Sequence, residues 1–271
     1  SKSIAPVHQL IRAASDINDA NIDTRLPLPE NEDELYQLAS TINELLNRIE
    51  SSIQQQKQFT ADASHEIRTP LAAIRGTLEV LIRKKREPEQ YEEKIKEVIT
   101  QTDRLNQLLD QLLQLARLEA GSVKKEIVFL NEILKVAEFK FAKQIQEKGM
   151  LVTSTIDESV SVHSDAFFLT VIIENLLSNA VKYGLPDGKI YFSWNNESKT
   201  FSITNDGVGI TQQQIPYLFN RFYRTDNSRS SLVAGSGLGL AIVKKLADLQ
   251  QITTAVNSIP GSITFSLAFP A

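Results

Sequence analysis

Two long stretches with apolar residues at helical spacing constrain the fold more than any other feature of this sequence. The first stretch has two runs that repeat every three or four residues: Leu35, Leu38, Ile42, Leu45 and Ile49, and then Ile67, Leu71, Ile74, Leu78 and Leu81. Such spacing is typical of helices that pair with other helices. Residues 51–58 are polar and rich in glutamine, and we interpret them as a weaker part of one continuous helix that starts near Glu34.

A second stripe follows a charged run at residues 83–88 and indicates a partner helix. Its members are Ile95, Val98, Thr102, Leu105, Leu109, Leu112 and either Leu115 or Ala116. Gly121 is a plausible cap at its end. Two long helices joined by a short turn predict an antiparallel hairpin. A single hairpin would expose a long apolar stripe, so we expect a homodimer in which two hairpins form a four-helix bundle.

The two ends of the chain differ from this hairpin. Residues 6–19 predict a short amphipathic helix, and a polar connector at residues 20–33 carries Pro27 and Pro29. After Gly121 the pattern predicts one α/β domain with helices on a mixed sheet. Expected strands lie at 125–130, 150–156, 160–163, 188–195, 199–205, 252–257 and 262–268, and expected helices at 131–148, 166–183 and from near 237.

Composition removes several classes of function. The 271-residue chain has no cysteine, which excludes disulfides, thiolate chemistry and cysteine zinc sites. Its net charge of −4 provides no general attraction to nucleic acid, so we expect no nucleic-acid partner. No run of about 18 apolar residues is present to span a bilayer.

His65 is the candidate chemical residue of the first long helix. It precedes the seam residue Ile67 by two positions, about 200° around a helix, so its imidazole is expected to point outward. A neutral imidazole can accept a phosphoryl group, and the neighbouring Glu66 can hold the proton of the other ring nitrogen. Thr69, four residues later on the same face, can position a water. The alternative is a solvated surface histidine, which is our interpretation of His8 and His163.

Residues 64–71 read Ser-His-Glu-Ile-Arg-Thr-Pro-Leu and resemble the H-box of the sensor histidine kinases of two-component systems. The resemblance implies that His65 is the phosphoacceptor on a dimerisation helix. It also implies a response-regulator receiver domain as partner, with Thr69 supporting dephosphorylation of that regulator.

A candidate nucleotide site lies in the C-terminal part of the chain. Asn175 and Asn179 are four residues apart and face one side of a predicted helix. Asn179 offers a neutral oxygen to Mg²⁺, and Lys182 can reach a phosphate. The asparagines alone are equally compatible with a decorated core helix. Asp206 follows a predicted strand, and its carboxylate can accept the amino group of adenine.

Two glycine segments complete this pattern. Residues 206–210 read Asp-Gly-Val-Gly-Ile, and residues 235–240 read Gly-Ser-Gly-Leu-Gly-Leu at a predicted helix start, where amides suit phosphate oxygens. Each segment alone predicts only a turn. Together with residues 175–183 they resemble the N-box, G1 box and G2 box of the Bergerat-type ATP-binding domain of histidine kinases, gyrase, Hsp90 and MutL.

The Bergerat resemblance implies ATP and Mg²⁺ as cofactors. The implied ATP-binding residues are Asn175, Asn179, Lys182, Tyr183, Asp206, Gly207, Gly209, Ile210, Gly235, Gly237, Leu238 and Gly239, with Asn179 as the metal ligand. Residues 219–224 resemble the kinase F-box, and the segment up to residue 234 would be a lid. Arg224, with Arg221 as the alternative, would steady the γ-phosphate. Gyrase-like relatives have a glutamate where Asn175 stands, so its absence favours transfer to histidine over hydrolysis.

Residues 6–50 resemble a HAMP linker, which normally follows a transmembrane helix. We therefore expect three domains: a HAMP linker at 1–52, an all-α hairpin for a dimeric four-helix bundle at 53–121, and an α/β-sandwich ATP-binding domain at 122–271. We expect the chain to be the cytoplasmic part of a membrane sensor histidine kinase, anchored by transmembrane segments outside this sequence. The alternatives are a catalytically silent dimeric scaffold and a Bergerat-type ATPase. Transfer within one chain or across the dimer stays open.

Overall fold

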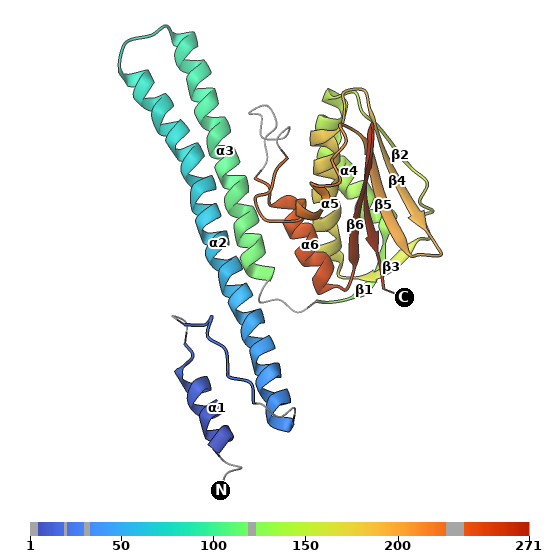
Figure 1. The fold of residues 1–271 in the computed structure, drawn as a ribbon. Coiled ribbons are helices and arrows are strands. Elements are labelled where there is room, and N and C mark those ends of the chain that lie inside the picture. Colours follow the sequence, from blue (N-terminus) through green and yellow to red (C-terminus); the bar gives the residue numbers. More distant parts are fainter. Residues whose placement is uncertain (1–4, 19–20, 30–32, 119–122, 226–235, 271) are drawn as a thin grey trace. The chain divides into compact units, whose positions relative to one another are not determined.

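The computed structural model describes residues 5–18, 21–29, 33–118, 123–225 and 236–270 (Figure 1). The chain divides into two compact units, Ser1–His65 and Glu66–Ala271. The longest helix, α2 (Glu34–Ile82), contributes residues to both. Its continuity through the glutamine-rich residues 51–58 confirms the interpretation of that segment as helix.

The first unit consists of α1 (Ala5–Asp16), a connector and the first part of α2. Its core is formed by Leu10, Leu26 and Ala39, which are buried. Asn43 holds the connector to α2 by two hydrogen bonds: the Leu26 N–H donates to its Oδ1 at 2.8 Å, and its Nδ2 donates to the Leu26 carbonyl at 3.0 Å. The predicted first helix is confirmed, although it ends three residues earlier than expected, at Asp16.

The helical hairpin of the second unit pairs the later part of α2 with α3 (Pro88–Leu118). Pro88 begins α3, where its fixed φ and missing N–H suit a first helical position. Large apolar side chains remain exposed along both helices of this single chain; among them are Leu71, Leu78, Ile95, Ile99, Leu109 and Leu113, each 40–54% exposed. The expected cap at Gly121 lies outside the described residues.

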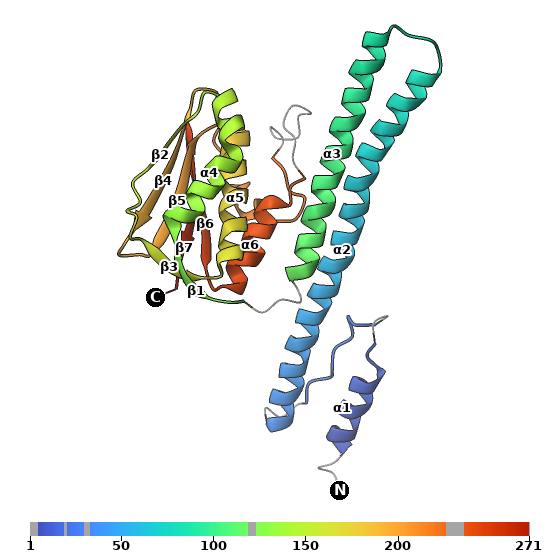
Figure 2. The same ribbon diagram turned by 180° about the vertical axis from the view of Figure 1, so that it is seen from behind.

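The rest of the second unit is an α/β sandwich (Figures 1 and 2). Its five strands are β2 (Leu151–Ser154), β4 (Lys189–Asn195), β5 (Thr200–Asp206), β7 (Ser262–Ala268) and β6 (Thr253–Ile259), in that order across the sheet. Only β2 and β4 are parallel among these neighbours. The helices α4 (Leu130–Glu147), α5 (Ala166–Tyr183) and α6 (Gly239–Leu249) cover one face. A short 3-10 helix, η1 (Ile215–Tyr217), lies before the glycine segment.

One expectation about this domain was wrong in detail. The strands β1 (Glu126–Phe129) and β3 (Ser161–Ser164) do not join the mixed sheet but pair with each other, antiparallel, as a separate two-stranded sheet. Each has four residues. By pairing with each other, the two strands form backbone hydrogen bonds without joining an edge of the larger sheet.

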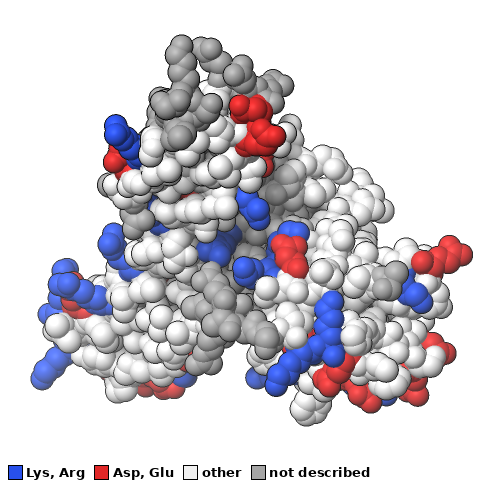
Figure 3. All heavy atoms as spheres, turned by 90° about the horizontal axis from the view of Figure 1, so that it is seen from below, with Lys and Arg blue, Asp and Glu red and all other residues white. Residues whose placement is uncertain are grey.

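The alternation of side chains along β5 decides what faces the helices. Phe201, Ile203 and Asn205 are buried on the helix-covered face, while the intervening residues are only partly buried. On the opposite face the strands carry polar pairs across β5 and β7, such as the Ser202 and Ser266 hydroxyls, 2.8 Å apart. The face seen in Figure 3 shows lysine and arginine interspersed with aspartate and glutamate. No helix in the described part of the chain is long and apolar enough to cross a membrane.

Candidate functional site

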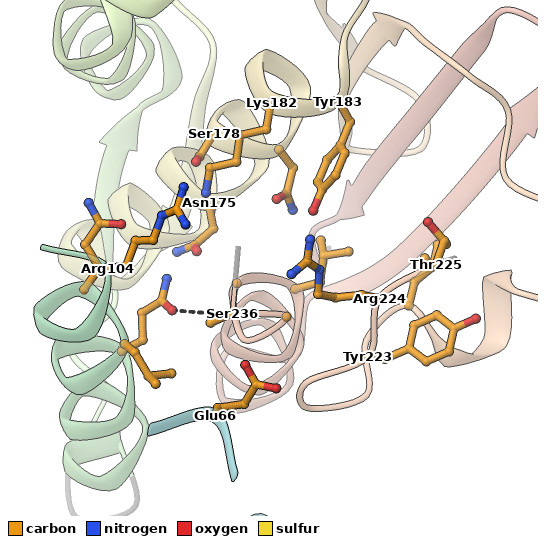
Figure 4. A pocket seen from close by; sticks show the side chains of 18 of the residues that line it. Glu66, Arg104, Asn175, Ser178, Lys182, Tyr183, Tyr223, Arg224, Thr225 and Ser236 are labelled. Carbon is orange, nitrogen blue, oxygen red and sulfur yellow. Dashed lines mark hydrogen bonds between the residues drawn. The ribbon is translucent and has the colours of Figure 1, made fainter. Parts of the chain in front are cut away.

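A cavity of about 570 Å³ lies in the second unit. Its wall is contributed by α2, α3, α5, the start of α6, and strands β5 and β7. Figure 4 shows that side chains from the hairpin and from the α/β sandwich face this space together. Its volume is in the range of pockets that hold nucleotide-sized ligands.

The helix α5 presents a polar stripe to the cavity. Asn175, Ser178, Asn179, Lys182 and Tyr183 all line it, at spacings of three and four residues, while nine apolar residues of the same helix are buried in the core. The helix start is fixed by a cap, since the Asp165 side chain accepts from a backbone N–H in the first turn. A core helix with one polar stripe is the arrangement that the asparagine spacing predicts for a binding site.

The far end of α5 is held by one ammonium group. Lys148 Nζ donates to the carbonyls of Val181, Lys182 and Gly184 at 2.7, 2.9 and 3.2 Å. Burial lowers the pKa of Lys148. A cation at the carboxyl end of a helix meets the carbonyls that have no partner within the helix, so this contact stabilises the end of α5 that carries Lys182 and Tyr183.

The glycine segment before α6 approaches α5 closely. Gly237 has φ +73°, in the left-handed region, and a Cβ there would lie 2.7 Å from the Phe222 carbonyl carbon. At Gly239 a Cβ would lie 2.8 Å from Asn175 Oδ1. The Asn175 amide is fixed because its Nδ2 donates to the Val171 carbonyl at 2.8 Å. Both positions therefore need glycine for steric reasons.

The same segment also contacts the hairpin. The Ser236 hydroxyl donates to Gln111 Oε1 of α3 at 2.6 Å, which is the dashed contact of Figure 4. The Leu238 N–H donates back to the Ser236 hydroxyl oxygen at 3.2 Å. Gln111, Ser236, Gly237 and Gly239 all line the cavity, so the amino end of α6 opens into it.

Two cationic side chains of this cavity, Lys182 and Arg224, lie near each other. Arg224 and Tyr183 point toward one another across it in Figure 4. Lys182 is exposed as a residue, yet partial burial in the cavity lowers its pKa, and the nearby Arg224 lowers this pKa further. A cation held with a depressed pKa beside a second cation is stabilised when an anion binds between them.

Asp206 does not lie where the sequence analysis expects it. Its Oδ2 accepts a hydrogen bond from the backbone N–H of Lys189 at 2.9 Å, and the residue is not part of the cavity wall. The preceding residue, Asn205, lines the cavity and is 3% exposed. The alternation of side chains along β5 explains why Asn205, and not Asp206, lines the cavity, because Asn205 lies on the same face of the strand as Phe201 and Ile203. That alternation was visible in the sequence and would have identified Asn205.

The remaining predicted residues divide between the cavity wall and its support. Ile210 lines the cavity, and its backbone N–H donates to the Ser258 hydroxyl at 2.8 Å. Leu238 is fully buried and is not part of the wall. Gly207 forms a bridge with Gly184, and neither it nor Gly209 belongs to the described wall. Gly235 and the expected lid at residues 226–234 lie outside the described residues.

The helix that carries His65 contributes to the wall as well. His65 is exposed on α2, as its position before Ile67 predicts, and the next residue, Glu66, lines the cavity. Thr69 lines the cavity one helical turn after His65. His8 and His163 are also exposed, and neither is part of this wall.

The described residues fit a nucleotide with Mg²⁺. Two glycines leave space that a Cβ would fill, and a helix amino end, Lys182 and Arg224 face the same volume. Asn179 offers a neutral amide oxygen there, a donor that suits Mg²⁺ when phosphate oxygens and waters supply the other ligands.

Comparisons with known proteins agree with this arrangement. Three family models match the chain: the HAMP domain at residues 1–51, the His Kinase A (phospho-acceptor) domain at 55–121, and the histidine kinase-, DNA gyrase B- and HSP90-like ATPase at 164–271. Among solved structures, the histidine kinase ThkA in complex with the response regulator TrrA matches with a TM-score of 0.67 at 20% identity, covering 88% of this chain and 68% of that one. The Acinetobacter baumannii histidine kinase AdeS matches with a TM-score of 0.62 at 20% identity, covering 76% of this chain and 96% of that one.

Curated relatives extend the agreement over nearly the whole sequence. The sensor protein CzcS of Cupriavidus metallidurans is 30% identical over 99% of this chain and 57% of its own length. The signal transduction histidine-protein kinase ArlS of Staphylococcus aureus is 31% identical over 97% of this chain and 60% of its own length. The chain thus spans somewhat more than half of these relatives. With its three matched domains in this order, the chain belongs to the sensor histidine kinases of two-component systems.

Proposed function

We propose that this chain transfers the γ-phosphoryl group of ATP to His65 and passes it on to an aspartate of a response-regulator receiver domain. The observation that carries the proposal is one cavity whose wall combines Glu66 and Thr69, next to the acceptor histidine in sequence, with Asn175, Asn179 and Lys182 of α5. The family membership supports the same reaction.

Each group has a defined part in this proposal. One ring nitrogen of His65 forms the new bond to phosphorus as the bond from the γ-phosphorus to its bridging oxygen breaks, and ADP leaves. Glu66 holds the proton on the other ring nitrogen, which keeps the attacking lone pair available. Lys182 and Arg224 neutralise the charge that develops on the phosphoryl oxygens. Asn179 would hold Mg²⁺, whose charge would offset that of the phosphate oxygens.

We further propose the wider setting that the sequence predicts. The exposed apolar side chains of α2 and α3 are buried in a homodimeric four-helix bundle. The domain limits are those predicted, at 1–52, 53–121 and 122–271. The structure of ThkA with TrrA provides an example of a kinase with this fold bound to a response regulator. Segments outside this sequence anchor the protein in the membrane, with these domains at its cytoplasmic face.

Incubation with γ-labelled ATP and Mg²⁺ tests the central reaction. We expect acid-labile, alkali-stable label on the wild type and none on His65→Gln. Asn179→Ala is expected to lose the label because it loses the metal. Steady phosphate release without labelled protein would instead identify an ATPase, and absence of both nucleotide binding and label would identify a silent scaffold.

Thr69 is tested by the reverse activity. In the proposal its hydroxyl positions a water for dephosphorylation of the regulator, so Thr69→Ala should keep autophosphorylation and lose most of the regulator phosphatase rate. Thr60→Ala, on the same helix outside the cavity wall, is the matched control. An unchanged phosphatase rate in Thr69→Ala would remove this residue from the mechanism.

A further inference from the structure

The helix α3 contributes one face to the cavity, and this face carries a cation. Gln101, Arg104, Leu108 and Gln111 line the wall at spacings of three and four residues, which places them along one side of the helix. Among the residues that the structure describes, no hydrogen bond or ion pair engages the Arg104 guanidinium. It is exposed, so binding a ligand there breaks no existing contact.

The charges around the cavity favour a polyanion. Its described wall contains three cationic side chains, Arg104, Lys182 and Arg224, and one carboxylate, Glu66. Figure 4 shows the Arg104 side chain extending from α3 toward α5, where Ser178 and Lys182 face the same space. A phosphate lying against the polar stripe of α5 would therefore meet a guanidinium from the opposite side, and a guanidinium matches two phosphate oxygens at once.

The position of Arg104 along α3 indicates which part of the nucleotide it meets. Gln111 contacts Ser236 at the glycine segment, and Arg104 is seven residues away, about 10 Å along the helix axis. The cavity is also lined by Asn205, Ile263 and Phe265 of the sheet, and these buried, largely apolar side chains suit a base. Arg104 faces α5 instead, so it lies on the phosphate side.

We propose that Arg104 contacts the terminal phosphate of bound ATP and thereby joins the hairpin to the nucleotide. The inference rests on the proposed function, because it takes ATP as the ligand. The nucleotide is then contacted from both sides: by the ATP-binding domain through α5 and α6, and by the hairpin through α3. ADP lacks the terminal phosphate and would leave this contact unmade.

The test compares affinities for a non-hydrolysable ATP analogue and for ADP, by calorimetry on the whole chain, in the wild type, Arg104→Gln and Arg104→Lys. We expect Arg104→Gln to lose about tenfold in affinity for the analogue and to bind ADP as the wild type does, with slower labelling of His65. Arg104→Lys should recover part of the affinity, since it keeps the charge and loses the planar fork.

The control is Arg75→Gln, which removes an exposed arginine of the hairpin that pairs with Glu79 at 2.7 Å and does not line the cavity. Equal losses for the analogue and ADP, or no loss for either, would overturn the inference while wild-type labelling keeps the proposed function. A wild type that neither binds the analogue nor labels overturns both. The melting temperature of each variant separates misfolding from a lost contact, and if Arg104→Gln does not fold, Arg104→Lys alone decides by the same comparison.

Discussion

Lys182 carries a positive charge where the ligand-free protein disfavours it. Burial and the neighbouring Arg224 lower its pKa below 10.5. Between that lowered pKa and 10.5 the unfolded chain binds more protons at this site than the folded chain does. The contribution of Lys182 to the free energy of unfolding therefore rises with pH through this alkaline window.

Nucleotide binding should reverse this shift. Phosphate oxygens favour the charged ammonium, so the pKa of Lys182 rises in the complex and the protein takes up a proton within the same alkaline window. Calorimetry of ATP binding in two buffers of different ionisation enthalpy measures this uptake. We expect uptake in the wild type and little in Lys182→Gln, which should also bind ATP at least tenfold more weakly. Equal uptake in both proteins would assign the proton to another group.

Asn205 is expected to matter more for the base than Asp206. Its Nδ2 donates to the Asp206 carbonyl at 3.1 Å, which orients the amide oxygen as an acceptor. Asn205→Leu should weaken ATP binding by about tenfold or more, because a buried acceptor for the adenine amino group is lost. Asp206→Asn should weaken it less. Fluorescence titration with an ATP analogue compares them, and a larger loss in Asp206→Asn would restore the original prediction.

At the level of single residues, the sequence predicted which residues line the cavity better where they repeat at helical spacing than where they lie beside glycines. Asn175, Asn179 and Lys182 line the cavity as expected, since four-residue spacing determines a helix face. Asp206 was predicted in place of Asn205 because a carboxylate suits the amino group of adenine. The alternation of side chains along the strand, which places Asn205 on the helix-covered face, was given less weight. Arg104 was not singled out at all, because its importance depends on a cavity that forms between segments far apart in the sequence.

At the scale of helices and strands, the ATP site requires close packing of α5 against the start of α6. At Gly239 an added methyl group would lie 2.8 Å from Asn175 Oδ1, an amide already fixed to its own helix. We expect Gly239→Ala to displace the amino end of α6, to weaken ATP binding and to lower the free energy of unfolding by about 1–3 kcal/mol.

Gly76 provides a matched control in the interior of α2. A Cβ there would meet no atom within 4 Å. Gly76→Ala should therefore leave ATP binding unchanged and stabilise the protein by about 0.5–1 kcal/mol, since alanine favours the helix. Chemical denaturation and nucleotide titration of both variants check the pair; comparable behaviour of the two alanines would mean that packing at Gly239 is not tight.

Helices and strands with a strong periodic pattern were predicted well, but the pairing of strands with one another was predicted less well. The helix α5 and the strand β7 have the limits expected from the sequence, because capping residues and alternation mark their ends. The separate pairing of β1 and β3 was missed, since a four-residue strand carries too little pattern to choose a partner.

For the whole molecule, the exposed apolar stripe of the hairpin predicts association. Leu78 and Leu109 are 45% and 40% exposed in the single chain. Changing both to lysine should place charges in the expected bundle interface and convert the dimer into a monomer, which light scattering after size-exclusion chromatography detects. Gln90→Lys, at an exposed position of α3, should remain dimeric. A dimeric double variant would place the interface elsewhere.

The ammonium of Lys148 at the end of α5 has a geometric consequence. Its three N–H bonds diverge from one nitrogen, and three backbone carbonyls accept them. A guanidinium is flat and directs its donors within a plane, so arginine cannot reproduce this tripod although it preserves the charge. Substitution of lysine by arginine is usually regarded as conservative. At position 148 it would leave at least one of these carbonyls without its hydrogen bond and destabilise the helix end beside the cations of the cavity.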